Sequence, residues 1–358
     1  MATKDQYPRS LHSLAKFIDD ALHLEPFSDT LAGFHYNREL LRAAVANTYI
    51  ETVGNKADSL YLAIHRTSLK DIADSFISVS SVITRHVNLS SKNVMLAFDY
   101  TDEDYYGELS NLWIHTWTKE HGVTGKFKFL SCNVVNDDLM MPIFSIPAQM
   151  GVSTAHDIEY IDEQVQKNHV VGKIDLSLFD RGFYSKEVMH KLDNRGIPYL
   201  ILVPKNEAVK KEFEGMENGE KKRTRELFSF YKNGDKIEFD AYLSFIKGVF
   251  NRKTESYLDW CFATNIGRIG LSSMIGTYKK RWRIETNFRV QDEANIKCKS
   301  TDVKVRYLLF AYQQILQMHW TLFYKGDGVG FKRYLIELSK ECDRLVEKSE
   351  RKRSAYPL

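Results

Sequence analysis

Hydrophobic residues in the first quarter of the chain recur at helical spacing. The earliest set comprises Leu11, Leu14, Phe17, Ile18 and Leu22. Residues 58–87 continue the pattern as one helix, a short break and a second helix, so we predict a helical amino-terminal region over residues 1–90. One interpretation is a helix-turn-helix that turns basic side chains toward DNA, and the other is an ordinary helical bundle. The basic side chains in question are His65, Arg66, Lys70 and Arg85.

From Asn93 onward the pattern changes to short apolar runs that are typical of strands. NVMLAFDYTD, NLWIHTW and KFKFLSCNVV come first, and KIDLSLFD and IPYLILVPKN follow. Two helical segments lie among them, HDIEYIDEQVQKN and SKEVMHKLDNRG, the second with a serine cap and a glycine stop. This alternation predicts an α/β sheet covered by helices on both faces, the first part of a core over residues 91–204.

The pattern of hydrophobic and polar residues changes again over residues 205–270, and it predicts a β-rich insertion. The charge-mixed stretch EAVKKEFEGMENGEKKRTREL is expected to be solvated, LFSFYKNGDKIEFDAYLSF predicts a hairpin around Asn233-Gly234, and YLDWCFATNI is a further strand. Residues 271–358 return to helical spacing at about 272–296, 303–324 and 331–348. The sequence thus predicts the second part of the α/β core followed by carboxy-terminal helices.

Composition and charge narrow the class of protein. The 358 residues carry a net charge of only +3, and the four cysteines are too widely spaced for a disulfide framework or a zinc site. The amino-terminal residues have no apolar leader, and the most apolar run, residues 307–323, contains several Gln and His side chains, so we expect a cytoplasmic protein. Charge is uneven, however: residues 247–299 hold 11 Lys or Arg against 5 Asp or Glu.

Three acids form the candidate chemistry. Asp99 follows the apolar run VMLAF, Asp180 follows KIDLSLF, and Glu285 lies within the helical segment TYKKRWRIETNFRVQDE. Acids at the carboxyl ends of neighbouring strands point into one crevice, where a helical carboxylate could join them. Three adjacent carboxylates need a compensating cation, and oxygen ligands favour Mg²⁺ or Mn²⁺, two of which can promote phosphodiester chemistry.

Each acid also has an ordinary interpretation. Asp99 could cap a turn, with Asp102 or Asp104 as the ligand in its place. Asp180 could be a turn residue before Arg181-Gly182, and Glu285 could be an ion-pair partner of Arg281 four positions earlier.

The residues around Glu285 favour the metal hypothesis. Tyr278, Arg281 and Glu285 fall on one helical face. The same segment is unusually basic, because it also contains Lys279, Lys280, Arg283 and Arg289. A basic helix face around a single carboxylate suits a metal ligand that lies beside a phosphate backbone.

The segment YKKRWRIETNF resembles the Tyr-x2-Arg-x3-Glu signature of prokaryotic insertion-sequence DDE transposases, through Tyr278, Arg281 and Glu285. FDYTD resembles the region of the first catalytic Asp of that family and points to Asp99, and FDRGFYS resembles the second and points to Asp180. YLDWCFATNI is also similar to the family, and the resemblance spans about residues 94–325.

The resemblance implies an RNase H-like catalytic domain with a β-rich insertion before the last catalytic helix. It also implies that Asp99, Asp180 and Glu285 bind two metal ions, and that Tyr278 and Arg281 contact DNA phosphates. One position departs from the family, because Asp292 stands where the signature continues to a Lys, and Lys297 or Lys299 is the candidate replacement.

These observations together predict a DNA transposase that cleaves transposon ends and joins the freed 3′-hydroxyl to target DNA. Double-stranded DNA is the expected partner, bound by a homodimer that would associate with the nucleoid. Trp260 could stack on a flipped base, although core packing is the alternative. Two other functions stay open, a metal-dependent nuclease of the same fold and an inactive DNA-binding derivative.

Overall fold

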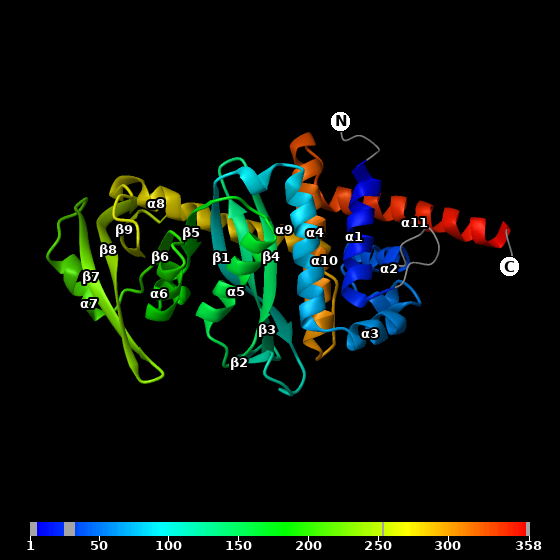
Figure 1. The fold of residues 1–358 in the computed structure, drawn as a ribbon, viewed down its shortest axis with the longest axis horizontal. Helices are drawn as coiled ribbons and strands as arrows, with labels where there is room; N and C mark the ends of the chain where they lie inside the picture. Colours follow the sequence, from blue (N-terminus) through cyan, green and yellow to red (C-terminus); the bar gives the residue numbers. More distant parts are fainter. Residues whose placement is uncertain (1–5, 25–32, 253, 356–358) are drawn as a thin grey trace.

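The computed structural model describes residues 6–24, 33–252 and 254–355, so parts of the predicted regions 1–90 and 271–358 lie outside the described residues. The molecule is elongated, with most of the helices at one end and a sheet that extends to the other (Figure 1). The predicted α/β class is confirmed, because one mixed sheet is flanked by helices.

The helical end of the molecule combines the two ends of the sequence. Its amino-terminal elements are α1 (Gln6–Leu22), α2 (Gly33–Ala46), η1 (Ile50–Thr52), α3 (Ala57–Arg66), α4 (Leu69–Arg85) and η2 (Leu89–Ser91). These helices share one core with α10 (Val303–Phe323), which packs on α4, and α11 (Phe331–Ala355), which packs on α2 (Figure 1). The predicted helix, break and helix are confirmed as α3 and α4, and Ser68 and Asp71 form a capping box where α4 begins.

Nine strands form one hydrogen-bonded sheet in the order β2-β3-β1-β5-β6-β9-β8-β7, with β4 also paired to β3. Among the strand pairs of the described residues, β1–β5 and β5–β6 are parallel and the others are antiparallel. The strands are β1 (Val94–Tyr105), β2 (Ile114–Glu120), β3 (Val123–Val135), β4 (Met140–Ala148), β5 (Ile174–Phe179), β6 (Tyr199–Leu202), β7 (Lys221–Lys232), β8 (Asp235–Asn251) and β9 (Ser256–Thr264).

The remaining helices cover the two faces of this sheet, as the alternation of strands and helices predicted. One face packs on α5 (Thr154–Lys167) and α6 (Lys186–Asn194), and the other packs on α8 (Leu271–Lys279), η4 (Lys280–Trp282) and α9 (Arg283–Gln291). The shorter elements are η3 (Arg181–Phe183), α7 (Glu207–Glu214), η5 (Asp292–Ala294) and η6 (Lys325–Asp327).

Local signals account for several of these boundaries. The Ser185 hydroxyl accepts a hydrogen bond from the Val188 N–H at the start of α6, and Gly196 ends that region with a positive φ of 63°. The predicted hairpin is also confirmed: Asn233 and Gly234 both have positive φ and join β7 to β8, whose closing pair is Lys232 and Asp235.

Other boundaries differ from the prediction. Asp99 does not end its strand, because β1 continues to Tyr105 by pairing with β3 after its pairing with β5 has stopped. The stretch expected to be solvated contains helix α7 and the start of β7, and β4 has no predicted counterpart. The predicted helix over 272–296 is divided into α8, η4, α9 and η5, and the last helix extends beyond the predicted 331–348.

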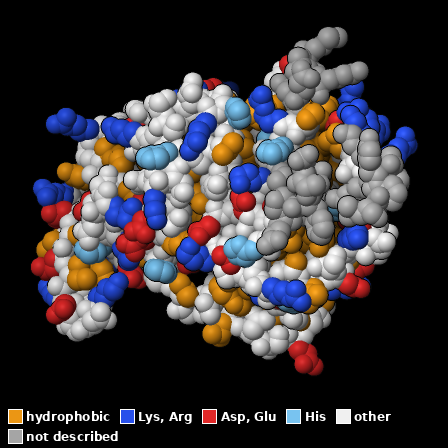
Figure 2. All heavy atoms as spheres, turned by 45° about the vertical axis from the view of Figure 1, so that its right-hand side comes forward, with side chains coloured by type: hydrophobic (Ala, Val, Ile, Leu, Met, Phe, Trp, Pro, Cys, Tyr) orange, Lys and Arg blue, Asp and Glu red, His pale blue; other side chains and the backbone are white. Residues whose placement is uncertain are grey.

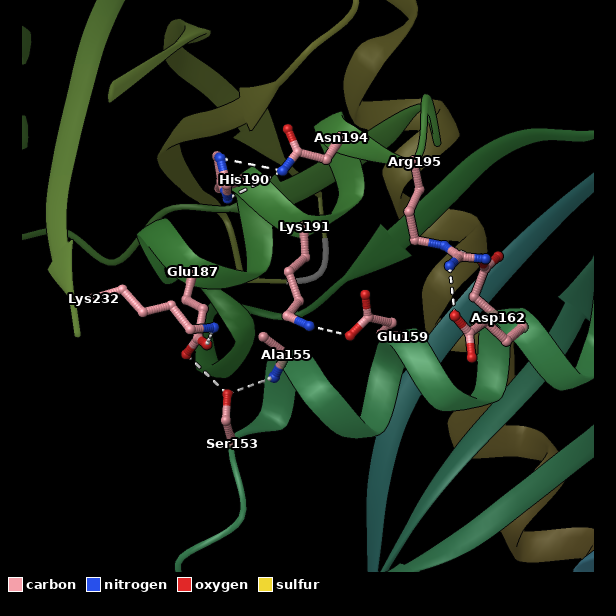
Figure 3. Close-up of polar contacts among 11 residues, drawn as sticks. Ser153, Ala155, Glu159, Asp162, Glu187, His190, Lys191, Asn194, Arg195 and Lys232 are labelled. Atoms are coloured by element: carbon pink, nitrogen blue, oxygen red, sulfur yellow. Dashed lines mark hydrogen bonds and ion pairs between the residues drawn. The ribbon is translucent and has the colours of Figure 1, made fainter. Parts of the chain in front are cut away.

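Ion pairs fix α6 against α5 and against the insertion (Figure 3). Lys191 pairs with Glu159, and the Arg195 Nε donates to Asp162 at 2.8 Å. Glu187 accepts hydrogen bonds from the Ser153 hydroxyl at 2.9 Å and, through its other oxygen, from the Lys232 Nζ at 3.1 Å. Since α6 follows the loop that carries Asp180, these contacts hold that end of the sheet in place.

The surface mixes charges of both signs. On the face drawn in Figure 2, Lys and Arg side chains stand among Asp and Glu side chains and do not form one continuous patch. No described helix combines the length and the apolar character that a membrane crossing requires.

Candidate active site

Strand register places two of the predicted acids side by side. The parallel pairing of β1 with β5 ends at Phe98 and Phe179, so Asp99 and Asp180 are the next residues of the two strands. Side chains alternate along a strand, and Ala97 and Leu178 belong to the core under α8 and α9. Asp99 and Asp180 therefore leave the sheet on the face that those helices cover.

The third acid reaches this position from the covering helices. Tyr278 ends the buried face of α8, Arg281 lies in η4, and Glu285 lies in the first turn of α9. The spacing of three and four residues keeps the three side chains on one face across the change from α-helix to 3₁₀-helix. The predicted trio of Asp99, Asp180 and Glu285 is thus brought to one place.

Arg281 lies at the centre of the cluster. Its Nη1 donates to the Asp99 Oδ2 at 2.6 Å, and its Nη2 lies 3.9 Å from the Asp180 Oδ1 and 3.6 Å from the Glu285 Oε1. The Arg281 side chain is only 6% exposed, whereas Glu285 is 61% exposed. One buried guanidinium therefore contacts all three carboxylates, and Glu285 is the most accessible of them.

Burial and nearby charges shift the pKa values of the groups in this site. Burial raises the pKa of Asp99 to about 6, Arg281 opposes this rise, and the neighbouring Asp180 adds to it. Burial also raises the pKa of Tyr278, whose hydroxyl lies 3.4 Å from the Asp180 Oδ1. Among the residues that the structure describes, no group of three or more Asp, Glu, His or Cys side chains is arranged to hold one metal ion. The acids surround Arg281 in this conformation.

Neighbouring amides hold α9 over the sheet. The buried Asn287 donates from Nδ2 to the Asn133 Oδ1 of β3 at 2.9 Å, and Gln317 of α10 donates to the Asn287 carbonyl at 3.0 Å. These contacts fix the turn that contains Glu285. The sequence analysis did not identify them, because amides on three distant segments carry no local signal.

The loop before α8 is anchored by the insertion. Arg223 of β7 donates to the Ser244 hydroxyl at 3.0 Å and to the carbonyls of Gly267 and Ile269 at 2.5 and 2.6 Å. Lys221 of the same strand donates to the Ser272 hydroxyl at 2.9 Å. The β-strands of the insertion therefore position the start of the segment that carries Arg281 and Glu285.

The alternatives for the individual acids are now distinguishable. Asp102 and Asp104 lie 3.3 and 3.8 Å from the Lys126 Nζ of β3 and do not belong to the cluster around Arg281. The ion pair expected between Glu285 and Arg281 is present, but the same arginine also contacts Asp99 and Asp180.

The basic residues predicted to bind DNA have varied positions. Arg281 and Tyr278 are buried. Lys280 and Arg283 turn toward Asp137, which follows β3, whereas Lys279 and Arg289 are exposed. In the helical region, His65 contacts Asp302 and Lys70 pairs with Asp74.

A cavity of about 760 Å³ lies along the second half of β1, between that strand and the end of α9. Its lining includes Thr101, which is two residues after Asp99, and Asp292 at the end of α9. Lys297 and Lys299 line the same cavity, so both candidates for the missing basic residue lie close to Asp292. The Lys299 Nζ lies 4.6 Å from the centre of the Tyr49 ring.

Trp260 occupies the core under α8. Its side chain is buried, and its ring centroid lies 6.1 Å from that of Tyr278 and 5.9 Å from that of Phe262. Trp260 therefore packs in the core, which is the alternative to stacking on a flipped base. The neighbouring Trp282 is more exposed, at 44%.

Two comparisons with known proteins agree with this geometry. The model of a family described as Transposase DDE domain matches residues 117–306, a range that contains Asp180 and Glu285 and covers more than half of the chain. Among solved structures, the chain is similar to the cryo-EM structure of the piggyBac transposase synaptic complex with hairpin DNA. The TM-score is 0.57 at 12% sequence identity, over 98% of this chain and 80% of that chain. This likeness is consistent with an RNase H-like fold. No curated protein matches the sequence.

Proposed function

The chain belongs to the DDE-domain transposases, a family of enzymes that act on DNA, and from this we propose that Asp99, Asp180 and Glu285 form its catalytic centre. In the proposed reaction, water cleaves a phosphodiester at each transposon end and leaves a 3′-hydroxyl. That hydroxyl then attacks a phosphodiester of the target DNA, and the 3′-oxygen of the target strand leaves as the new bond forms.

The observation that carries this proposal is the convergence of three carboxylates on Arg281. All three lie within 4.0 Å of one guanidinium, although they come from β1, from the loop after β5 and from α9. Such a concentration of negative charge is unfavourable unless a cation compensates it. Arg281 supplies this positive charge in the conformation described, and we propose that divalent ions supply it in the active enzyme.

The donor atoms fit the divalent ions that members of the family generally use. Asp99, Asp180 and Glu285 offer only carboxylate oxygens, which favour Mg²⁺ or Mn²⁺, and we propose two such ions. Bound ions of this kind promote attack on a phosphodiester and stabilise the leaving oxygen. The buried Nε of Arg281 has no hydrogen-bond partner among the described residues, so this arginine is incompletely satisfied where it now lies.

The protein's own residues would orient the DNA. Exposed Lys279 and Arg289 lie on the segment that carries Glu285, and Lys297 and Lys299 line the cavity along the second half of β1. The cavity is lined by both signs of charge, since Asp102, Glu103 and Asp104 of β1 lie in it as well, and we propose that Lys297 and Lys299 contact the phosphates there. We propose double-stranded DNA as the partner and, since two ends must be joined, a homodimer as the active form bound to the nucleoid.

The test is a transposition assay with a donor plasmid that carries the gene within its native flanking DNA. Purified protein, Mg²⁺ and a target plasmid are expected to yield joined products whose junctions can be sequenced. Asp99→Asn, Asp180→Asn and Glu285→Gln should each abolish these products. Glu293→Gln, an exposed change two residues beyond α9, should leave them intact.

Two outcomes separate the rival functions. Cleaved donor without joined product would identify a metal-dependent nuclease, and DNA binding without cleavage would identify a DNA-binding derivative. Cleavage that survives Asp99→Asn would remove Asp99 from the catalytic centre.

A further inference from the structure

Two basic side chains converge on one exposed carboxylate at the turn between β3 and β4. The Lys280 Nζ lies 2.8 Å from the Asp137 Oδ2, and the Arg283 Nη2 lies 3.6 Å from the Asp137 Oδ1. The Asp137 side chain is 75% exposed, whereas Lys280 is only 22% exposed. The Arg283 side chain is 38% exposed, so one exposed acid pairs with a largely buried lysine and a partly exposed arginine.

The frame around this ion pair is fixed. The Arg283 Nη1 donates to the Asn136 carbonyl at 2.6 Å, which leaves Nη2 directed toward Asp137. The Asn136 Oδ1 accepts from the Met95 N–H at 2.7 Å, and its Nδ2 donates to the Asn93 carbonyl at 3.2 Å, so the turn is tied to the start of β1. The Asp137 side chain can therefore leave the site while these hydrogen bonds of the turn remain in place.

The position suits a DNA strand that passes through the catalytic centre. Met95 precedes Asp99 by four residues of β1, which is about 13 Å along an extended strand. Lys280 and Arg283 also flank Arg281 in sequence, so the same short segment faces both the acid cluster and the turn that contains Asp137. A phosphate at this turn would belong to the same duplex, about four base pairs from the phosphodiester that reacts.

The Asp137 carboxylate resembles a backbone phosphodiester in charge and in offering two oxygens to an Arg and a Lys. We propose that Lys280 and Arg283 form a binding site for a DNA backbone phosphate, and that Asp137 occupies this site as an internal substitute until DNA displaces it. This inference rests on the proposed function, since it requires that the chain binds DNA.

The balance of energies allows this exchange. An exposed ion pair is weak, so Asp137 is displaced at little cost. A phosphate on duplex DNA gains in addition from the release of condensed counterions. Asp137 therefore lowers the affinity for DNA in general without closing the site, and only a strand held by several other contacts displaces it readily.

The test measures binding of a fluorescent duplex of random sequence by anisotropy, in EDTA and at several salt concentrations. Asp137→Asn should tighten binding by about two- to fivefold, the effect of removing one weak competing pair. The slope of log affinity against log salt should change by less than one, because both proteins make the same phosphate contacts once DNA has displaced Asp137. In a Lys280→Gln, Arg283→Gln background, Asp137→Asn should have no such effect.

Asp138→Asn is the matched control, since Asp138 is the next residue, is equally classed as exposed, and loses the same charge. Equal tightening by the two variants would show that only net charge matters, and would overturn the inference while leaving DNA binding intact. Unchanged binding by Asp137→Asn would overturn it as well. Absence of DNA binding by the wild-type protein would refute the proposed function itself. Unfolding curves in urea confirm that each variant remains folded.

Discussion

Replacing Arg281 by Gln should convert the acid cluster into a much stronger site for divalent cations. The guanidinium is almost fully buried and contacts Asp99, Asp180 and Glu285 at 2.6 to 3.9 Å. It now supplies the positive charge that the three acids require. A neutral amide of similar length would leave three carboxylates that only protons or metal ions can neutralise.

The size of the effect follows from the distances. Two unit charges about 4 Å apart interact by roughly 4 kcal/mol at an effective dielectric constant of about 20. Solvent reaches Asp180 and Glu285, whose side chains are 36% and 61% exposed, so only a fraction of this energy applies. We therefore expect a gain in Mn²⁺ affinity of about ten- to a hundredfold, or about 1.4 to 2.8 kcal/mol.

The assay is calorimetric titration of the DNA-free protein with Mn²⁺. Arg281→Lys retains the positive charge and should keep the weak affinity of the wild type. Arg283→Gln removes a charge from the same segment but contacts Asn136 and Asp137 instead of the acids, so it should change the affinity little. Circular dichroism checks that Arg281→Gln is folded, because loss of one partner from a buried ion pair costs about 3–5 kcal/mol.

The reasoning would be refuted by a folded Arg281→Gln protein whose Mn²⁺ affinity equals or falls below that of the wild type. Equal gains in Arg281→Gln and Arg283→Gln would also refute it, since they would indicate a general charge effect and not release of the acids.

Three further predictions concern stability. Burial raises the pKa of Asp157 from 3.8 to about 6, so the folded state retains a proton that the unfolded chain releases, and stability falls as the pH rises through that window. In urea titrations, the free energy of unfolding of Asp157→Asn should therefore equal that of the wild type near pH 4 and exceed it by about 1–2 kcal/mol at pH 7. Partial solvent access limits this gain. Gly248→Ala should lower the free energy of unfolding by about 1–2 kcal/mol, because Gly248 has a φ of 63° and a Cβ there would overlap the Asn218 side chain. Gly276 lies in α8 with open space around it, so Gly276→Ala should instead raise the free energy of unfolding by about 0.5–1 kcal/mol. Arg223→Gln should cost about 2–4 kcal/mol and speed amide hydrogen exchange at residues 267–272, whereas Arg225→Gln at an exposed ion pair should do neither.

Elements with local signals could be predicted from the sequence. The capped helix α6 and the Asn233-Gly234 hairpin were found because their stop and turn residues act within a few positions. Strand β4 and helix α7 were missed, since a short apolar run with two prolines and a charge-rich stretch carry no clear periodicity. The end of β1 was misplaced because pairing with β3, a long-range contact, extends it past Asp99.

The three acids and the pairing of Glu285 with Arg281 could be proposed from the sequence, but the contacts of Arg281 with Asp99 and Asp180 could not. The resemblance assigned Arg281 to DNA phosphates, whereas the structure places it among the carboxylates. Burial decides this outcome, and the burial arises from packing of α8 and α9 on strands that lie far away in sequence. In the same way, no local pattern links Asp137 to Lys280 across 143 residues.

The pairing of β6 with β9 has a mechanical consequence for the insertion. Ile201 and Leu202 are paired in register with Ala263 and Phe262, so one hydrogen-bonded sheet extends from β1 and β5 to β7. An insertion that is hydrogen-bonded into the sheet in this way cannot rotate about a flexible hinge relative to the other strands. The outer edge of the insertion therefore lies at a fixed distance from Asp99. A duplex in contact with that edge would be held at the same distance. Recognition of different DNA ends can then change by exchange of side chains at that edge, with the reacting geometry preserved.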